Sequence, residues 1–223
     1  MKVKYLGHAS FKIEEDGIII YVDPWLTGPT SPITIDDVDK ADIVLVTHDH
    51  TDHGFVEGRE ICKKTGAYFV ALNELANKAG EQGVENIHTL NIGGSVNIGG
   101  VMVTLVQAFH SAGTGAPTGF VVRFPSSSFY HAGDTGVFSS MELLGELYAP
   151  IDLALLPIGS YFVMDIHQAA LAVKLLKPKN VIPMHYDTFP VIEANPDKFK
   201  HLVSETSPDT KVIIIKPRES TEI

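Results

Sequence analysis

The stretch THDHTDHG, residues 47–54, places three histidines and two aspartates within six consecutive positions. Imidazole and carboxylate groups bind divalent metals, and a plain surface loop needs neither of them. His48 and His50 are two residues apart, so in an extended segment they point to the same side and can bind one ion. Asp52 and His53 are adjacent and begin the next turn or helix, where they face a second point. The spacing therefore predicts two neighbouring metal sites.

Further metal-binding residue types follow predicted strands elsewhere in the chain. The apolar run ADIVLVTH, residues 41–48, ends at His48 and is typical of a strand buried on both faces. His110 ends a predicted strand–turn–strand over 91–110, Asp134 ends a hairpin over 118–134, and His185 follows a short strand starting at 180. Side chains at strand ends can converge at one rim of a sheet. These four segments are therefore expected to build one site.

The remaining pattern predicts a mixed α/β chain. Residues 3–15 read as one strand, followed by an Asp16-Gly17 turn and a second strand over 18–23. Helices are expected near 54–64, 72–82, 167–177 and 197–204, and further strands at 151–159 and 211–216. Two packed sheets with helices outside satisfy this order. No linker or repeat interrupts the sequence, so residues 1–223 are expected to form a single domain.

Composition restricts the class of protein. Hydrophobic residues make up 44% of the 223 residues and charged residues 20%, as in soluble globular proteins. The net charge of −10 and the lack of a Lys/Arg block argue against nucleic acid as a partner. Cys62 is the only cysteine, which fits a reducing compartment, and it is expected to be a buried thiol. With no signal peptide and no run of ~20 apolar residues, we expect a cytoplasmic protein without a membrane partner.

The motif HDHTDH, followed by an isolated His110, Asp134 in HAGDTG and His185 in IPMHY, resembles the metallo-β-lactamase superfamily over nearly the whole chain. The resemblance implies an αββα sandwich of the α/β (α+β) class, with two mixed sheets flanked by helices and a dinuclear metal site. The implied ligands are His48, His50 and His110 for one ion, Asp52, His53 and His185 for the other, and Asp134 as the bridge. Zn or Mn suits such a site best, and Fe or Ni is also compatible.

Within the superfamily, the chain resembles the compact branch related to ascorbate-6-phosphate lactonase and its relatives among the metal-dependent hydrolases. The resemblance is carried by GHAS around His8, by the DP element at Asp23 and by KPKNVIPMHYDTFP, residues 177–190. It implies that a hydroxide bridging two divalent metals attacks a carbonyl or phosphorus centre of a small-molecule substrate. Asp52 and His8 are the candidate catalytic side chains.

Several positions near the motif have a functional and a structural interpretation. His8 either lies near the metals or is a hydrogen-bonded core histidine. Asp23 either orients a ligand histidine through its ring N–H or is a turn aspartate. His131 either supports the site or simply ends a strand. Asp165 is expected to cap a helix, next to a loop, GSYFVMD, that resembles a substrate-facing loop. Asp49 lies at a variable position of the motif and reads as a solvated loop residue.

Two other functions stay open at this point. One is a nuclease or phosphodiesterase of the same superfamily, although His185 lies only 51 positions after Asp134, too few for the inserted domain of RNA-processing members. The other is a non-catalytic scaffold stabilised by metal. No phosphate loop and no G-x-S-x-G nucleophile motif is present, so a covalent nucleophile is not expected. The sequence leaves open the substrate, the metal and whether the chain forms a homo-oligomer.

Overall fold

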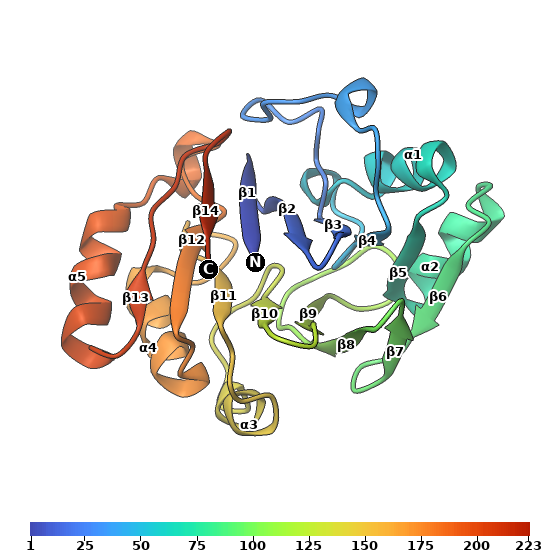
Figure 1. Cartoon of the computed structure of the whole chain (residues 1–223). Helices are drawn as coiled ribbons and strands as arrows, with labels where there is room; N and C mark the ends of the chain where they lie inside the picture. The colour runs from blue at the N-terminus through green and yellow to red at the C-terminus, as the bar shows by residue number, and fades with distance from the viewer.

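A computed structural model describes residues 1–223 as two seven-stranded sheets that face each other, with helices on their outer sides (Figure 1). The first sheet has the order β14-β1-β2-β3-β4-β5-β6. Its strands are β1 (Lys2–Gly7), β2 (Ser10–Glu15), β3 (Ile18–Val22), β4 (Ile43–Leu45), β5 (Tyr68–Leu72), β6 (Ile87–Leu90) and β14 (Ser220–Glu222). Strands β3 to β6 pair in parallel, and the others pair antiparallel.

The second sheet repeats this plan, with the order β13-β12-β11-β10-β9-β8-β7. Its strands are β7 (Ser95–Ile98), β8 (Val101–Gln107), β9 (Thr118–Arg123), β10 (Ser128–His131), β11 (Leu153–Pro157), β12 (Asn180–Met184) and β13 (Lys211–Val212). Here β7 to β10 pair antiparallel and β10 to β13 pair in parallel. The predicted sandwich of two mixed sheets flanked by helices is thus confirmed.

Five α-helices cover the outer faces of the sheets (Figure 1). They are α1 (Phe55–Thr65), α2 (Asn73–Glu81), α3 (Met141–Leu147), α4 (Ile166–Leu176) and α5 (Pro196–Thr206), and there are three single 3₁₀ turns, η1 (Ile35–Asp37), η2 (Thr51–His53) and η3 (Pro190–Ile192). α1 and α2 pack on the first sheet, whereas α4 packs on the second. None of these helices has the length and apolar character required to cross a membrane.

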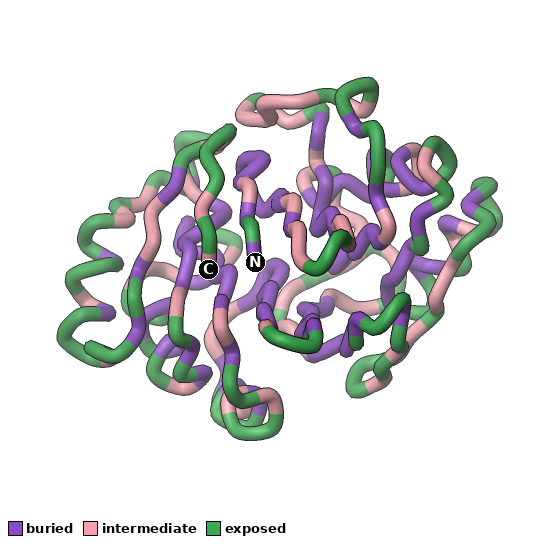
Figure 2. The backbone as a smooth tube through the Cα atoms, in the orientation of Figure 1, coloured by how far each residue is buried: buried purple, intermediate pink, exposed green.

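Buried residues, purple in Figure 2, run through the strands of both sheets. Their apolar side chains form three layers, one between the sheets and one under each set of helices. The run ahead of His48 shows how. Ile43 and Leu45 point into the layer between the sheets, and Val44 and Val46 point into the layer under α1 and α2. Because successive strand residues face opposite sides, a strand covered on both faces must be apolar throughout. The burial of β4 therefore sets the position at which the metal-binding motif begins.

The first fifteen residues differ from the prediction of a single strand. They form two antiparallel strands, β1 and β2, which pair from Lys2 opposite Glu14 to Gly7 opposite Ser10. The chain turns at Gly7 and His8, which have φ angles of 99° and 56°. The alternation of apolar residues continues across this turn, so the pattern alone did not reveal it. The predicted turn at Asp16 and Gly17 is confirmed, since both residues have positive φ angles, as a tight hairpin requires.

Candidate metal centre

Residues from five segments meet at one rim of the sandwich. His48 and His50 follow β4, Asp52 and His53 lie on η2, His110 follows β8, Asp134 follows β10 and His185 follows β12. The strand-end residues thus converge as expected, because the two sheets bring the ends of β4, β8, β10 and β12 to the same side. Asp134, His48, His53 and His185 are buried, and the remaining three are half-buried.

His48, His50 and His110 form the first group of nitrogen ligands, with their ligand atoms within 4.8 Å of one another. The Nε2 of His48 lies 3.0 Å from the Nδ1 of His50. Two nitrogens bound tetrahedrally to one zinc ion at about 2.0–2.1 Å lie roughly 3.3 Å apart. The two side chains therefore have a separation close to that of ligands of one ion.

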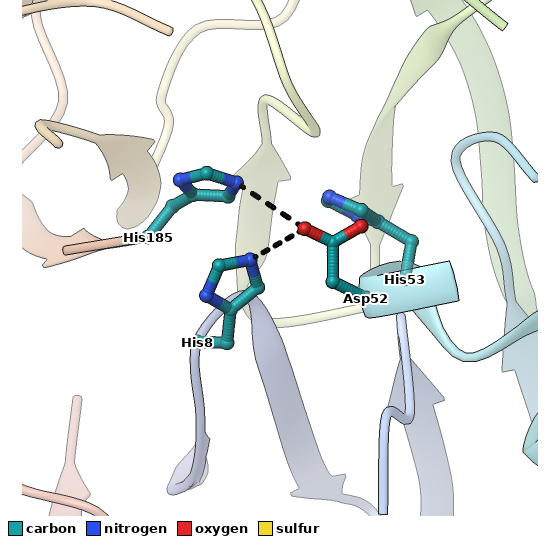
Figure 3. Close-up of side chains that lie close together, drawn as sticks. All are labelled: His8, Asp52, His53 and His185. Carbon is teal, nitrogen blue, oxygen red and sulfur yellow. Dashed lines mark hydrogen bonds and ion pairs between the residues drawn. The ribbon is translucent and has the colours of Figure 1, made fainter. Parts of the chain in front are cut away.

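Asp52, His53 and His185 form a second group, and His8 joins them (Figure 3). The Nε2 atoms of His8 and His185 lie 3.1 and 4.0 Å from the Oδ2 of Asp52. Figure 3 shows both histidines pointing toward this carboxylate from separate segments, with His53 beside it. Four potential ligand atoms thus surround one point.

Asp134 lies between the two groups. Its Oδ1 is 3.2 Å from the Nε2 of His53, and its Oδ2 is 3.2 Å from the Nε2 of His185 and 3.5 Å from that of His110. One carboxylate therefore contacts members of both groups through its two oxygens. This geometry is what a ligand shared between two ions requires.

Several of these buried atoms lack a hydrogen-bond partner, namely the Nε2 of His53, both ring nitrogens of His185 and the Oδ1 of Asp134. A buried polar atom without a partner costs about 1–3 kcal/mol, so folded proteins rarely keep one without a reason. Three of them, the Nε2 atoms of His53 and His185 and the Oδ1 of Asp134, belong to residue types that bind divalent metals, and each Nε2 lies 3.2 Å from an oxygen of Asp134. These three atoms therefore fit a metal centre, because a bound ion supplies the partner that each of them lacks.

Asp23 orients two of the histidines from outside the group. It is fully buried, and its Oδ2 lies 2.6 Å from the Nδ1 of His53. The Thr47 hydroxyl donates to the same oxygen at 2.7 Å and lies 3.0 Å from the Nδ1 of His48. Because this hydroxyl donates to Asp23, it accepts from the Nδ1–H of His48, which leaves the Nε2 of His48 free as a ligand. Of the two interpretations of Asp23, the geometry favours orientation of a ligand histidine.

His8 joins the N-terminal turn to the segment that carries His185. Its Nδ1 lies 2.9 Å from the Thr188 hydroxyl, and its carbonyl accepts the His185 N–H at 2.8 Å. Its ring centre is 4.0 Å from that of His185. His8, Asp23 and His185 all have positive φ angles, of 56°, 44° and 55°. Non-glycine residues in this region are strained and cluster at functional sites.

Burial and charge act in opposite directions on the groups of the site. Burial lowers the pKa of His48 to about 2 and that of His8 to about 4, so both rings are neutral at pH 7. Burial also disfavours the charged form of His53, but the Asp134 and Asp23 carboxylates outweigh it and raise its pKa well above the ordinary value. Conversely, His53 and His185 overcome burial and hold the pKa of Asp134 well below its usual range. The metal-free site is thus a buried, internally compensated charge cluster.

A cavity of about 270 Å³ opens onto the group. It is lined by His50, Asp52, His110, Ser111, Asp134, Phe162 and His185. Phe162 belongs to the loop GSYFVMD, which borders the cavity as expected, and Ser111 belongs to the Gly-rich segment after His110, which borders it as well. Phe162 is 53% exposed, which leaves its ring available to a ligand. No Lys or Arg side chain lines the cavity.

Other positions singled out from the sequence lie further from the cavity. The Nε2 of His131 lies 2.9 Å from the Ala9 carbonyl, and its Nδ1 accepts the Gly133 N–H, so it ties the turn after His8 to the residue before Asp134. Asp165 caps α4 by accepting the N–H groups of the second and third residues after it, which confirms that prediction.

Asp49 lies in a loop as predicted, but the prediction that it is solvated is wrong. Its side chain is only 10% exposed and accepts the Gly113 N–H at 2.7 Å. The physical reason is that the segment after His110 folds over the motif and covers Asp49. Thr47 and Thr188 were not foreseen as part of the site. The position of Thr47 directly before the first histidine was the only signal available for it.

Comparison with known proteins agrees with the fold. The model of a family described as a beta-lactamase superfamily domain matches residues 2–185. A UPF0173 metal-dependent hydrolase of Caldivirga maquilingensis is 47% identical over 217 residues, which is 96% of this chain and 95% of the relative. One from Staphylothermus marinus is 48% identical over 225 residues, 98% of this chain and 97% of the relative.

Among solved structures, Igni18, a metallo hydrolase from the hyperthermophilic archaeon Ignicoccus hospitalis, superposes with a TM-score of 0.92. It is 42% identical, and the match covers 100% of this chain and 98% of that one. The sandwich of two mixed sheets flanked by helices is that of the metallo-β-lactamase fold. The chain belongs to the UPF0173 metal-dependent hydrolases of the beta-lactamase superfamily.

Proposed function

We propose that the chain hydrolyses a small, lactone- or ester-like substrate with two divalent metal ions held side by side at the rim of the sandwich. The observation that carries the proposal is the set of buried ligand atoms without hydrogen-bond partners on His53, Asp134 and His185. His48, His50 and His110 would hold one ion, Asp52, His53 and His185 the other, and Asp134 both. Bound ions of this kind lower the pKa of water to about 7 and polarise a substrate oxygen.

Asp52 is the carboxylate that we assign to proton handling. Its side chain is 27% exposed and lines the cavity, whereas that of Asp134 is only 3% exposed. A proton from attacking water can therefore reach the Oδ2 of Asp52. His8, held by Thr188 at Nδ1, points its Nε2 at that same oxygen and keeps it in place. This is the part of the reaction that the side chains themselves carry out.

The cavity favours a small uncharged substrate over nucleic acid. A volume of about 270 Å³ suits a molecule smaller than a typical drug-sized ligand. Binding of a nucleic-acid backbone depends on Lys and Arg, and none lines the cavity. Phe162 provides one apolar wall. We therefore place lactones, esters and thioesters ahead of phosphodiesters.

The test begins with the metal content of untagged protein, which should approach two ions per chain after loading with Zn²⁺ or Mn²⁺. The loaded protein is then assayed on a panel of lactones, thioesters and phosphodiesters. We expect turnover of the carbonyl compounds. Absence of turnover on every compound, or a single ion per chain, would contradict the proposal.

Three alanine variants make the assay specific. His110→Ala and His185→Ala should each remove one metal ligand and lower kcat/KM by more than about 100-fold. Loss of a residue that only orients a ligand lowers activity by at most about 100-fold. His201→Ala is the matched control, since this histidine is 73% exposed and pairs only with Glu205. A control variant as impaired as the other two would show a general loss of folding.

A further inference from the structure

The segment that carries His110 is irregular and partly exposed. Residues 108–117 contain no helix or strand, and Ser111, Gly113 and Gly115 are exposed to solvent. Such segments are usually mobile unless side chains fix them. A metal ligand on this segment therefore needs a specific contact that holds it against the rest of the site.

Asp49 provides such a contact from inside the metal-binding motif. Its Oδ1 accepts the Gly113 N–H at 2.7 Å, and its Oδ2 lies 3.4 Å from the Nζ of Lys78 on α2. Lys78 in turn donates to the hydroxyl of Thr114 at 3.0 Å. Two side chains, one acidic and one basic, thus hold two consecutive residues of the segment.

The glycines of the segment allow this close approach. A Cβ atom at Gly113 would lie 3.1 Å from the Oδ2 of Asp49, which is tighter than ordinary contact. Gly115 has a φ of 72°, and a Cβ there would lie 2.5 Å from the side chain of Leu72 at the end of β5. The segment is therefore packed against both the motif and the first sheet, and it is not free in solvent.

We propose that Asp49 and Lys78 form a clamp that holds His110 in position to bind the same ion as His48 and His50. Asp49 is then a positioning residue that acts through the segment it holds. Its location makes this effective, because its chain neighbours on both sides are the other two ligands. The clamp rests on the metal centre proposed above, and it contacts neither His53 nor His185, which belong to the other ion.

Hydrogen–deuterium exchange on the metal-free protein, together with Co²⁺ titration under chelator competition, tests the clamp. Asp49→Ala should speed exchange of the Gly113 segment. It should lower the affinity for one of the two Co²⁺ ions by about 10- to 100-fold, as the loss of a residue that orients a metal ligand does. The affinity for the other ion should stay unchanged. Asp49→Asn, which keeps an acceptor oxygen but no charge, should fall between Asp49→Ala and the wild type.

Two further variants keep the test falsifiable. The Nζ of Lys78 lies 5.3 Å from the centre of the Phe55 ring. Lys78→Met keeps an unbranched apolar side chain at this place, so it should fold even if Asp49→Ala does not, and it should weaken the binding of the same ion. Asp39→Ala, at an exposed aspartate, is the control and should behave as wild type.

Unchanged exchange in the Gly113 segment overturns the clamp, and so does faster exchange with unchanged Co²⁺ affinity or equal weakening of both ions. These outcomes differ from failure of the proposed function. In that case the wild-type chain itself fails to bind two ions or to hydrolyse any compound of the panel, irrespective of how the variants compare.

Discussion

The Oδ2 of Asp23 lies 2.6 Å from the Nδ1 of His53, and both side chains are fully buried. The two residues are 30 positions apart: Asp23 directly follows β3, and His53 lies on η2, in the segment after β4, which pairs in parallel with β3. The Asp23 carboxylate also accepts the N–H and the hydroxyl of Thr47, at 2.8 and 2.7 Å. One side chain thus determines which ring nitrogen of His53 faces Asp134.

Asp23→Ala should weaken metal binding without removing any ligand. Without Asp23, the His53 ring loses its orientation, and metal affinity should fall by about 10- to 100-fold. The buried Thr47 N–H also loses its acceptor, which should cost about 1–3 kcal/mol of unfolding free energy. Metal competition and urea unfolding of the metal-free protein measure the two effects separately. Asp209→Ala, at an exposed position, serves as the control, and an Asp23 variant that binds metal as tightly as this control would contradict the role.

Gly54→Ala should severely destabilise the protein, although the change adds a single methyl group. Gly54 ends the motif with a φ of 65°, and a Cβ there would lie 2.3 Å from the carbonyl carbon of Pro24. We expect the free energy of unfolding to fall by more than about 4 kcal/mol, because losses of this size arise from specific causes such as a steric clash in the core. Gly17→Ala is the matched control, because its φ is 79° but nothing lies within 4 Å of the added atom. It should cost only the backbone strain of about 1–2 kcal/mol, and equal losses for the two variants in thermal unfolding would contradict the steric account.

The strands and the helix around the site could be predicted from the sequence, because each has a distinctive local pattern of residues. The run before His48 is buried on both faces, so it is apolar throughout, and the helix after Asp165 has a capping residue followed by apolar residues at helical spacing. The missed elements lack such signals. β5 and β6 are short parallel strands, α3 has seven residues, and β14 pairs through three residues only. Their formation depends on neighbours that are distant in sequence.

The same distinction holds for the candidate site. Metal binding could be predicted from one short stretch of sequence, because it contains four metal-binding side chains at close spacing, His48, His50, Asp52 and His53. Thr188 and Asp49 could not be assigned, because their partners, His8 and Gly113, lie 180 and 64 positions away in sequence. Only the packing of the two sheets and their loops brings such pairs together.

Cys62 should resist thiol reagents in the folded protein. It lies on the buried side of α1 and is 3% exposed, and burial raises the pKa of its thiol from 9.0 to about 12. The folded state thus keeps the thiol protonated where the unfolded chain ionises it. The resulting contribution to stability is complete below pH 9 and is lost as the pH rises toward about 12.

An aromatic disulfide reagent at pH 8 should therefore label Cys62 slowly in the native protein and fully in denaturant. The unfolding free energy of the wild type should fall more steeply between pH 9 and pH 11 than that of Cys62→Ala, because the variant lacks the ionising group. Rapid labelling of the native protein would show that the thiol is accessible, and the same pH dependence for both chains would show that folding does not raise its pKa.

Removal of metal should lower the thermal stability of the chain, since a bound ion supplies partners to buried atoms of His53, Asp134 and His185. A ligand present at 100 times its Kd stabilises the folded state by about 2.7 kcal/mol, which corresponds to a Tm change of roughly 5–11 °C at this chain length. Calorimetry of Zn²⁺-loaded protein before and after chelation measures the change. Asp134→Ala is the informative variant, because Asp134 contacts both groups of ligands. Its Tm should barely respond to the chelator, and a response as large as that of the wild type would place the bound metal elsewhere in the molecule.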